Sequence, residues 1–238
     1  MSVPSSNYGP SQPSASTQAE RSALNKIMWF GIVQLIGLVA GWVVYFLAFG
    51  YVFSSAASLN LPQNPTPAQV GTALGPVFQE FTLVIPVSLA INLAGVLLLL
   101  IGFREFNRFD SSRFSVPSKL IYLLAIGVIF AGGAVVLLFN GLPNLIAQAP
   151  TTGTPNATFM SAVGGLLLFV GFAFIGAIIA LIGLIGGEIL GLWRVGSRYN
   201  DTVIKLGAIF VIIPLLNIVA PILILIGAAQ VKGRLGAA

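Results

Sequence analysis

Long apolar runs separated by short polar segments dominate the chain. Four runs are long enough to cross a hydrocarbon core of about 30 Å as helices, and they cover residues 27–49, 81–103, 120–142 and 161–193. A fifth run, 206–229, is as long but contains two prolines. No run shows the period-two alternation of a membrane barrel, and in lipid the backbone of each must satisfy its own hydrogen bonds. The pattern predicts an all-α polytopic transmembrane helical bundle with about five spans.

Polar segments flank the first apolar run on both sides. Residues 1–26 are rich in Ser, Pro and Gln, which predicts a disordered polar cytoplasmic tail, and residues 27–238 form the predicted transmembrane domain. The first run is too long for a cleaved signal peptide and should remain as an anchor. After it, the stretch Thr66-Pro67-Ala68-Gln69 has the capping-box pattern. It predicts a short amphipathic helix on the outer surface that leads into the second span.

The charged residues indicate how the chain is oriented. Nine of the eleven Lys and Arg residues precede the first span or lie in the second and fourth inter-span loops. The positive-inside rule places these segments and the N-terminus in the cytoplasm, so five crossings would leave the C-terminus outside the cell. Lys232 and Arg234 disagree with this count. A re-entrant last span, which would return them to the cytoplasm, is the alternative.

Two of the basic loops resemble each other at an offset of ninety residues. Residues 102–110 and 192–200 both read aromatic-Arg-x-x-x-Arg-aromatic-Asp/Asn. This predicts a duplicated helical hairpin in parallel orientation. The arginines concerned, which are Arg104, Arg108, Arg194 and Arg198, would anchor the topology. A lipid-headgroup or docking site built from both loops is the sharper alternative.

The second of these loops carries a family resemblance. The segment from Trp193 to Asp201, followed by a terminal span that contains Pro and Asn, resembles small archaeal polytopic membrane proteins that are grouped as a domain of unknown function. The similarity covers mainly the second half of the chain. It implies a membrane topology and an archaeal membrane, and it implies no chemistry.

A few polar residues interrupt the spans. Glu188 is the only carboxylate within a span, Asn217 lies between Pro214 and Pro221, and Ser88 and Asn92 lie one turn apart in the second span. A structural interpretation pairs Glu188 with Arg194, Arg198 or Arg104 and lets Asn217 bond a carbonyl freed by proline. The alternative is a solute or ion site at a broken helix, with these four residues as its candidates.

Small residues and one sequon complete the candidate sites. Gly183, Gly187 and Gly191 follow one face of the fourth span, and Gly37 and Gly41 have the same spacing in the first. Such spacing favours close helix packing within the chain, with a homo-oligomer interface as the alternative. The triplet that begins at Asn156 is a candidate N-glycosylation acceptor in an outer loop.

Composition limits the functions that remain. The chain is 57% apolar and 7% charged, which excludes an ordinary water-soluble protein. It contains no Cys and no His, so disulfides, thiol nucleophiles and His-based catalysis are excluded. We therefore expect no enzyme, no cofactor, no metal site and no nucleic-acid partner. The predicted role is structural, assembly or accessory, with membrane lipids, a second copy or another membrane protein as partner. The alternative is a small-solute or ion transporter or channel component.

Overall fold

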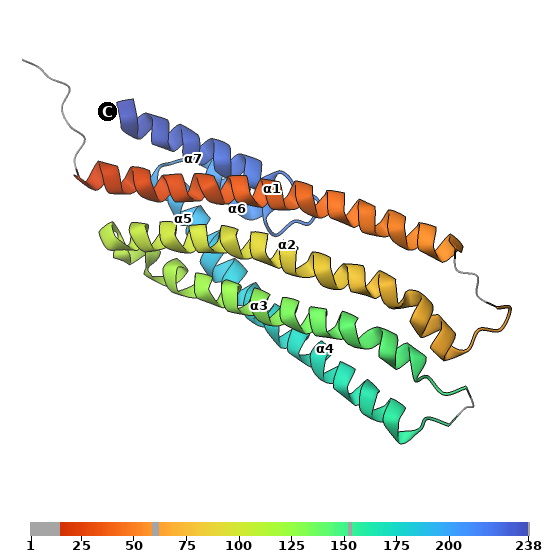
Figure 1. The fold of residues 1–238 in the computed structure, drawn as a ribbon. Helices are drawn as coiled ribbons and strands as arrows, with labels where there is room; N and C mark the ends of the chain where they lie inside the picture. Colours follow the sequence, from red (N-terminus) through yellow and green to blue (C-terminus); the bar gives the residue numbers. More distant parts are fainter. Residues whose placement is uncertain (1–14, 59–61, 152–153, 238) are drawn as a thin grey trace, which may run out of the picture.

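The computed structural model describes residues 15–58, 62–151 and 154–237, and these are almost entirely helical (Figure 1). The elements are α1 (Ala15–Ser58), α2 (Pro67–Phe109), α3 (Ser111–Ala147), α4 (Ala157–Gly183), the π-helical segment η1 (Leu184–Ile189), α5 (Leu190–Arg198), α6 (Thr202–Phe210) and α7 (Ala220–Ala237). Four helical stretches, 16–51, 67–109, 111–147 and 157–198, are long and apolar enough to cross a membrane. The predicted all-helical class and apolar helices are confirmed.

The four long stretches lie side by side in a row. α1 packs on α2, α2 on α3 and α3 on α4 (Figure 1). The α1–α2 and α3–α4 connections lie at one end of the row, and the α2–α3 turn lies at the other. Only at this second end do α5, α6 and α7 add a further layer, with α7 against α1. The long helices therefore form an open row that is closed into a bundle at one end.

The last apolar run does not form one continuous span. α6 ends at Phe210, residues 211–219 turn, and α7 runs back along α6 and α1. Pro214 lacks the N–H that a continuing helix needs, whereas Pro221 stands in the first turn of α7, where proline is tolerated. A single continuous span over 206–229 is therefore not confirmed, and the run instead forms a helical hairpin that turns back between its prolines.

This path brings the end of α7 back to the start of α1. The Lys232 ammonium donates to Asn25 Oδ1 at 2.9 Å, and Arg234 pairs with Asp201 at the start of α6. The described C-terminal residues thus lie at the same end of the molecule as the first turns of α1 (Figure 1). The prediction that the two termini lie on opposite sides of a membrane is not confirmed, because the last run turns back between its prolines.

The predicted N-terminal tail and the predicted short helix after Thr66 also need correction. Residues 15–26 belong to α1, and Ala23 and Leu24 are fully buried, so this part of the predicted tail is ordered helix; residues 1–14 lie outside the described residues. The capping box is confirmed, since Gln69 N donates to Thr66 Oγ1 at 3.3 Å and Thr66 N donates to Gln69 Oε1 at 2.9 Å. The helix it opens is not a separate surface helix, because α2 continues to Phe109 and packs on α3 at Gly71.

The two basic turns share a local design. Asp110 ends α2 and caps α3 by accepting a hydrogen bond from Arg113 N at 3.3 Å, and Asp201 caps α6 by accepting from Ile204 N at 3.0 Å. Asn200, just before Asp201, adopts a left-handed φ of 50°. The helices that follow differ, since α3 has 37 residues and α6 has nine. The helices before the turns are similar in length, with 43 residues in 67–109 and 42 in 157–198, but those after them differ, so the predicted duplicated hairpin is not confirmed.

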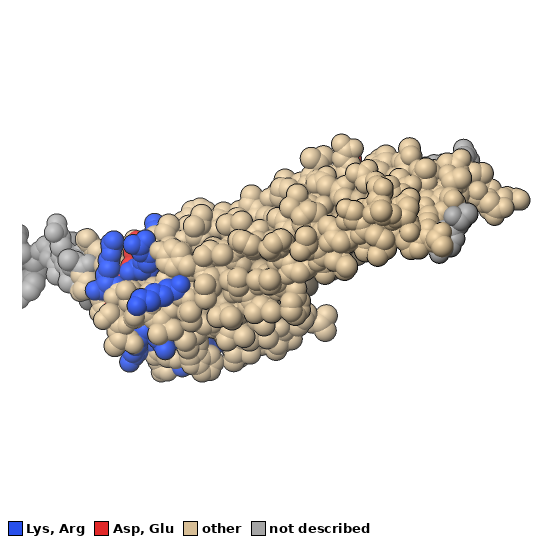
Figure 2. Space-filling view, turned by 90° about the horizontal axis from the view of Figure 1, so that it is seen from below, with Lys and Arg blue, Asp and Glu red and all other residues tan. Residues whose placement is uncertain are grey.

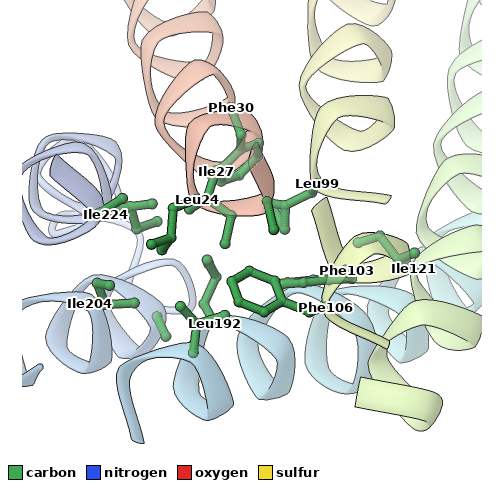
Figure 3. Close-up of a cluster of buried hydrophobic side chains, with 14 of the residues drawn as sticks. Leu24, Ile27, Phe30, Leu99, Phe103, Phe106, Ile121, Leu192, Ile204 and Ile224 are labelled. Carbon is green, nitrogen blue, oxygen red and sulfur yellow. The ribbon is translucent and has the colours of Figure 1, made fainter. Parts of the chain in front are cut away.

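The hydrophobic core lies at the closed end, where six helices converge (Figure 3). Phe106 and Phe114 are fully buried and their rings stack with centroids 4.8 Å apart. The same buried cluster includes Leu24, Ile27 and Phe30 of α1, Leu99 and Phe103 of α2, Ile121 of α3, Leu192 of α5, Ile204 of α6 and Ile224 of α7. This core holds the short helices against the row.

Close backbone approach joins α4 and η1 to α3. A Cβ at Gly183 would overlap the backbone of Leu124, and a Cβ at Gly187 would lie 2.6 Å from the nitrogen of Ile121. Gly41 in α1 has no atom within 4 Å of the corresponding position. Four of the five glycines that the sequence singles out therefore face a neighbouring element: Gly37, Gly183, Gly187 and Gly191.

Candidate functional site

A cavity of about 190 Å³ lies within the closed half of the molecule, and we call it the polar cavity after the few polar side chains in its lining. Its walls come from α1, α2, α3, η1, α7 and the turn at 211–219, and most of the lining is apolar. Four polar side chains line it: Gln34, Asn92, Glu188 and Asn217. The structure thus brings together Asn92, Glu188 and Asn217, three of the four predicted intramembrane polar residues. These three lie at least 29 positions apart in the sequence. Ser88 instead lines a separate apolar groove beside Gly37 and Gly41.

Glu188 is the buried carboxylate of this cavity. Its residue is only 7% exposed, and within the described residues it makes no hydrogen bond or ion pair. It lies on η1, where six residues widen to π-helical geometry, a feature common at functional sites. The predicted pairing of Glu188 with Arg194, Arg198 or Arg104 is wrong, because these side chains are engaged elsewhere or exposed at the helix ends.

Three amides face the same space. Asn92 donates through Nδ2 to the Ser88 carbonyl at 2.8 Å, which leaves its Oδ1 available to a ligand. Gln34 lies over Gly95, where a Cβ would come within 2.8 Å of its Nε2. Asn217, in the exposed turn, makes no side-chain hydrogen bond within the described residues, so the predicted bond to a freed carbonyl is not observed. Sequence reasoning missed Gln34, although a lone glutamine inside an apolar run was a usable signal.

Lys and Arg residues gather at the closed end of the molecule (Figure 2). Arg198 forms the centre of an ion-pair cluster, with Nη2 2.7 Å from Glu20 Oε1 and Nη1 2.6 Å from Asp110 Oδ2. The Tyr199 hydroxyl donates to Glu20 Oε2 at 2.8 Å, and the Arg198 guanidinium lies 5.2 Å above the Phe109 ring. These contacts, which we call the Arg198 clamp, join α5 to α1 and to the α2–α3 turn.

The Arg198 clamp shifts the protonation of two of its members. Burial raises the pKa of Asp110, but hydrogen bonds from Ser112 and the Arg113 N–H, together with the charge of Arg198, outweigh it and hold the pKa below its ordinary value. Burial and the hydrogen bond to Glu20 raise the pKa of the Tyr199 hydroxyl. Asp110 therefore stays ionised and Tyr199 stays protonated near neutral pH.

The four predicted headgroup arginines do not act alike. Arg198 is held within the clamp, and Arg194 donates to the backbone carbonyl of Arg113. Arg104 and Arg108 are exposed, so these two remain accessible to lipid headgroups. At the opposite end, Asn156 accepts a hydrogen bond from Phe159 N at 2.7 Å and caps α4. Its predicted modification stays a prediction.

Comparison with known protein families gives a match over most of the chain. The family described as "protein of unknown function (DUF973)" matches residues 21–238, a range that includes both the cavity and the Arg198 clamp. The match extends well beyond the second half of the chain, which carries most of the sequence resemblance. No curated protein and no solved structure matches the chain. Because the match covers nearly all of the sequence, the chain belongs to this family of unknown function, DUF973.

Proposed function

We propose that the protein crosses a cell membrane four times, with α6 and α7 as a re-entrant hairpin and the closed, basic end in the cytoplasm. The four long apolar stretches support the crossings. The gathering of Lys and Arg at one end supports the orientation by the positive-inside rule (Figure 2). The re-entrant hairpin brings Lys232 and Arg234 to this end, so they no longer disagree with the other nine basic residues.

Single-cysteine labelling tests this orientation, because the native chain contains no cysteine. Gly233 in α7 has no neighbouring atom within 4 Å of a Cβ position, and Gln63 is exposed at the opposite end. In intact cells a membrane-impermeant thiol reagent should label Gln63→Cys and not Gly233→Cys, which should react only after permeabilisation. Labelling of Gly233→Cys in intact cells would show the opposite orientation or a crossing by the last hairpin.

We further propose that the protein is a small-solute or ion transporter or channel component. The observation that carries this is Glu188, a buried carboxylate that has no partner in the described part of the chain and lies in a cavity with three amides. Burying an unpaired charge costs several kcal/mol, so such a residue in a membrane span marks a ligand or proton site. A purely structural role for Glu188 would need an arginine partner, and no such ion pair is present among the described residues.

Flux into liposomes tests the transport proposal. Glu188→Gln and Asn217→Leu should each reduce the flux of a transported solute at least about tenfold, since each loses a ligand interaction of at least about 1.4 kcal/mol. Glu80→Gln is the matched control, because Glu80 is an exposed carboxylate of α2 outside the cavity. Flux that is unchanged in Glu188→Gln, or absent for every ion and small solute tested with folded protein, would refute the proposal.

A non-enzymatic structural, assembly or accessory role is the second candidate. It is favoured by the open row of helices, because α4 packs chiefly on α3 and leaves much of its surface uncovered. Leu167, Leu168 and Phe174 of α4 are 64%, 64% and 67% exposed. An accessory protein should bring its partner through purification in mild detergent, and crosslinking in lipid should reveal a second copy. Recovery as a monomer alone in both experiments would count against this role.

A further inference from the structure

We propose that the polar cavity binds one small monovalent cation, which takes the place of a proton on Glu188. This inference rests on the proposed transport function and names the class of its substrate.

The size of the cavity limits the ligand. Sites for drug-sized molecules have volumes of roughly 300–1,000 Å³, and a water molecule occupies about 30 Å³ in the liquid. The cavity measures about 190 Å³, which is below this range and leaves room for an ion with a few waters. A small ion or a very small solute is therefore the occupant that fits.

The charge of the lining selects a single positive charge. Glu188 is the only ionisable side chain among the described residues that line the cavity, and its other polar residues are neutral amides. In a low-dielectric interior the total charge of site and ligand must be near zero. One carboxylate balances one monovalent cation, whereas sites for Ca²⁺ gather several carboxylates. An anion would face the carboxylate without a positive partner.

The nearby charged groups do not neutralise Glu188. Arg194 and Arg198 of α5 are bonded to the Arg113 carbonyl and to the carboxylates of the clamp, and Lys205 of α6 lies 5.7 Å from the Trp193 ring. In α3, the ionisable residues closest in sequence to the cavity-lining Leu124 are Lys119 and Tyr122, and both are exposed. α4 contains no ionisable residue. The carboxylate is therefore available to a ligand.

The oxygen atoms of the site suit a hard cation. Carboxylate and amide oxygens are the ligands that such ions prefer. Glu188 carries two, and the Oδ1 of Asn92, a residue that lines the cavity, is not used by the hydrogen bond from its Nδ2 to the Ser88 carbonyl. Gln34 and Asn217 each contribute an amide oxygen from other parts of the fold. Asn92 and Asn217 are exposed while Glu188 is buried, so the amides form the entrance and the carboxylate the base of the site.

Charge balance then makes the cation and a proton competitors. Without a cation the buried carboxyl is neutral when its oxygen carries a proton. When the cation enters, the O–H bond breaks, the proton leaves to water and the carboxylate binds the cation, so the charge of the site is zero before and after. The exchange is one cation for one proton and involves no oxidation or reduction.

Binding is tested with the full-length chain in detergent, in weakly buffered solution. LiCl, NaCl and KCl are the probes, and choline chloride at the same concentration controls for ionic strength. At about one hundred times Kd, a bound cation should raise the thermal midpoint by about 5–10 °C. At pH values where the carboxyl is protonated, cation binding should also release up to one proton per chain. In this range the affinity for the cation should fall up to tenfold for each unit by which the pH is lowered.

Three variants decide the assignment. Glu188→Gln should lose both the midpoint shift and the proton release, and Glu80→Gln should keep both. Gln34→Met retains the side-chain length but removes the amide, so it should bind the cation about tenfold more weakly while still releasing the proton at saturation. It carries the test if Glu188→Gln does not fold. A wild-type response reproduced by choline, or a full response in Glu188→Gln or Gln34→Met, overturns the inference.

The outcome separates this inference from the transport proposal. Cation binding without flux in vesicles refutes transport and leaves the cation site standing. Flux of a neutral solute without any cation-specific shift refutes the cation site and leaves transport standing.

Discussion

Replacing Arg198 with methionine tests the role of the clamp in stability. The guanidinium lies 2.6–2.7 Å from two carboxylates, its side chain is 26% exposed, and the Asp110 and Glu20 side chains are 11% and 16% exposed. Breaking a fully buried ion pair costs about 3–5 kcal/mol, and exposed pairs contribute less than about 1 kcal/mol. For this partly buried pair of contacts we expect a loss of about 2–3 kcal/mol in the free energy of unfolding.

Thermal unfolding in detergent measures this loss, with an expected fall in midpoint of about 5–10 °C. Arg108→Met is the control, because Arg108 is an exposed arginine at the same end, and it should change stability by less than about 0.5 kcal/mol. In a double-mutant cycle, the variant that carries both Glu20→Gln and Arg198→Met should lose about 1–2 kcal/mol less in the free energy of unfolding than the sum of the losses in the two single variants. Equal effects of Arg198→Met and Arg108→Met would refute the assignment of the clamp.

Four further predictions concern packing and pH. Gly183→Ala should destabilise the protein by about 1–3 kcal/mol in the same unfolding assay, because its Cβ would overlap the α3 backbone, whereas Gly41→Ala, with open space around it, should be neutral or slightly stabilising. Phe106→Ala should cost about 3–5 kcal/mol by emptying the centre of the core, and a loss under 1 kcal/mol would place the core elsewhere. The depressed pKa of Asp110 contributes stability that is present above about pH 4 and is lost as pH falls through its folded value. The raised pKa of Tyr199 contributes stability that is present below about pH 10 and is lost as pH rises further, so a Tyr199→Phe variant should lose this alkaline dependence.

Local pattern alone determined much of this protein. Apolar length predicted the four long helices, because an uncharged run in lipid has no alternative to helix. The capping box at Thr66 was readable because its two hydrogen bonds join residues three apart. Small residues spaced along the fourth span indicated close packing, and Gly183 and Gly187 do meet α3.

Interactions between distant segments decided the rest. Residues 15–26 look like a polar tail in sequence, yet Glu20 bonds to Arg198 and Tyr199, and Leu24 joins the core. The last apolar run is long enough to cross, and prolines alone allow either a bent span or a return. Its packing against α1, with Arg234 on Asp201, selects the return.

The candidate site shows the same division. Glu188, Asn92 and Asn217 stand out in sequence because polar residues are costly in lipid. That they share one cavity with Gln34, and that Glu188 has no arginine partner, depends on which faces of α1, α2, η1 and the 211–219 turn meet. A hydropathy pattern specifies how long a helix is and which solvent it prefers. It carries no information on which neighbour each face packs against, and that contact is what creates the site.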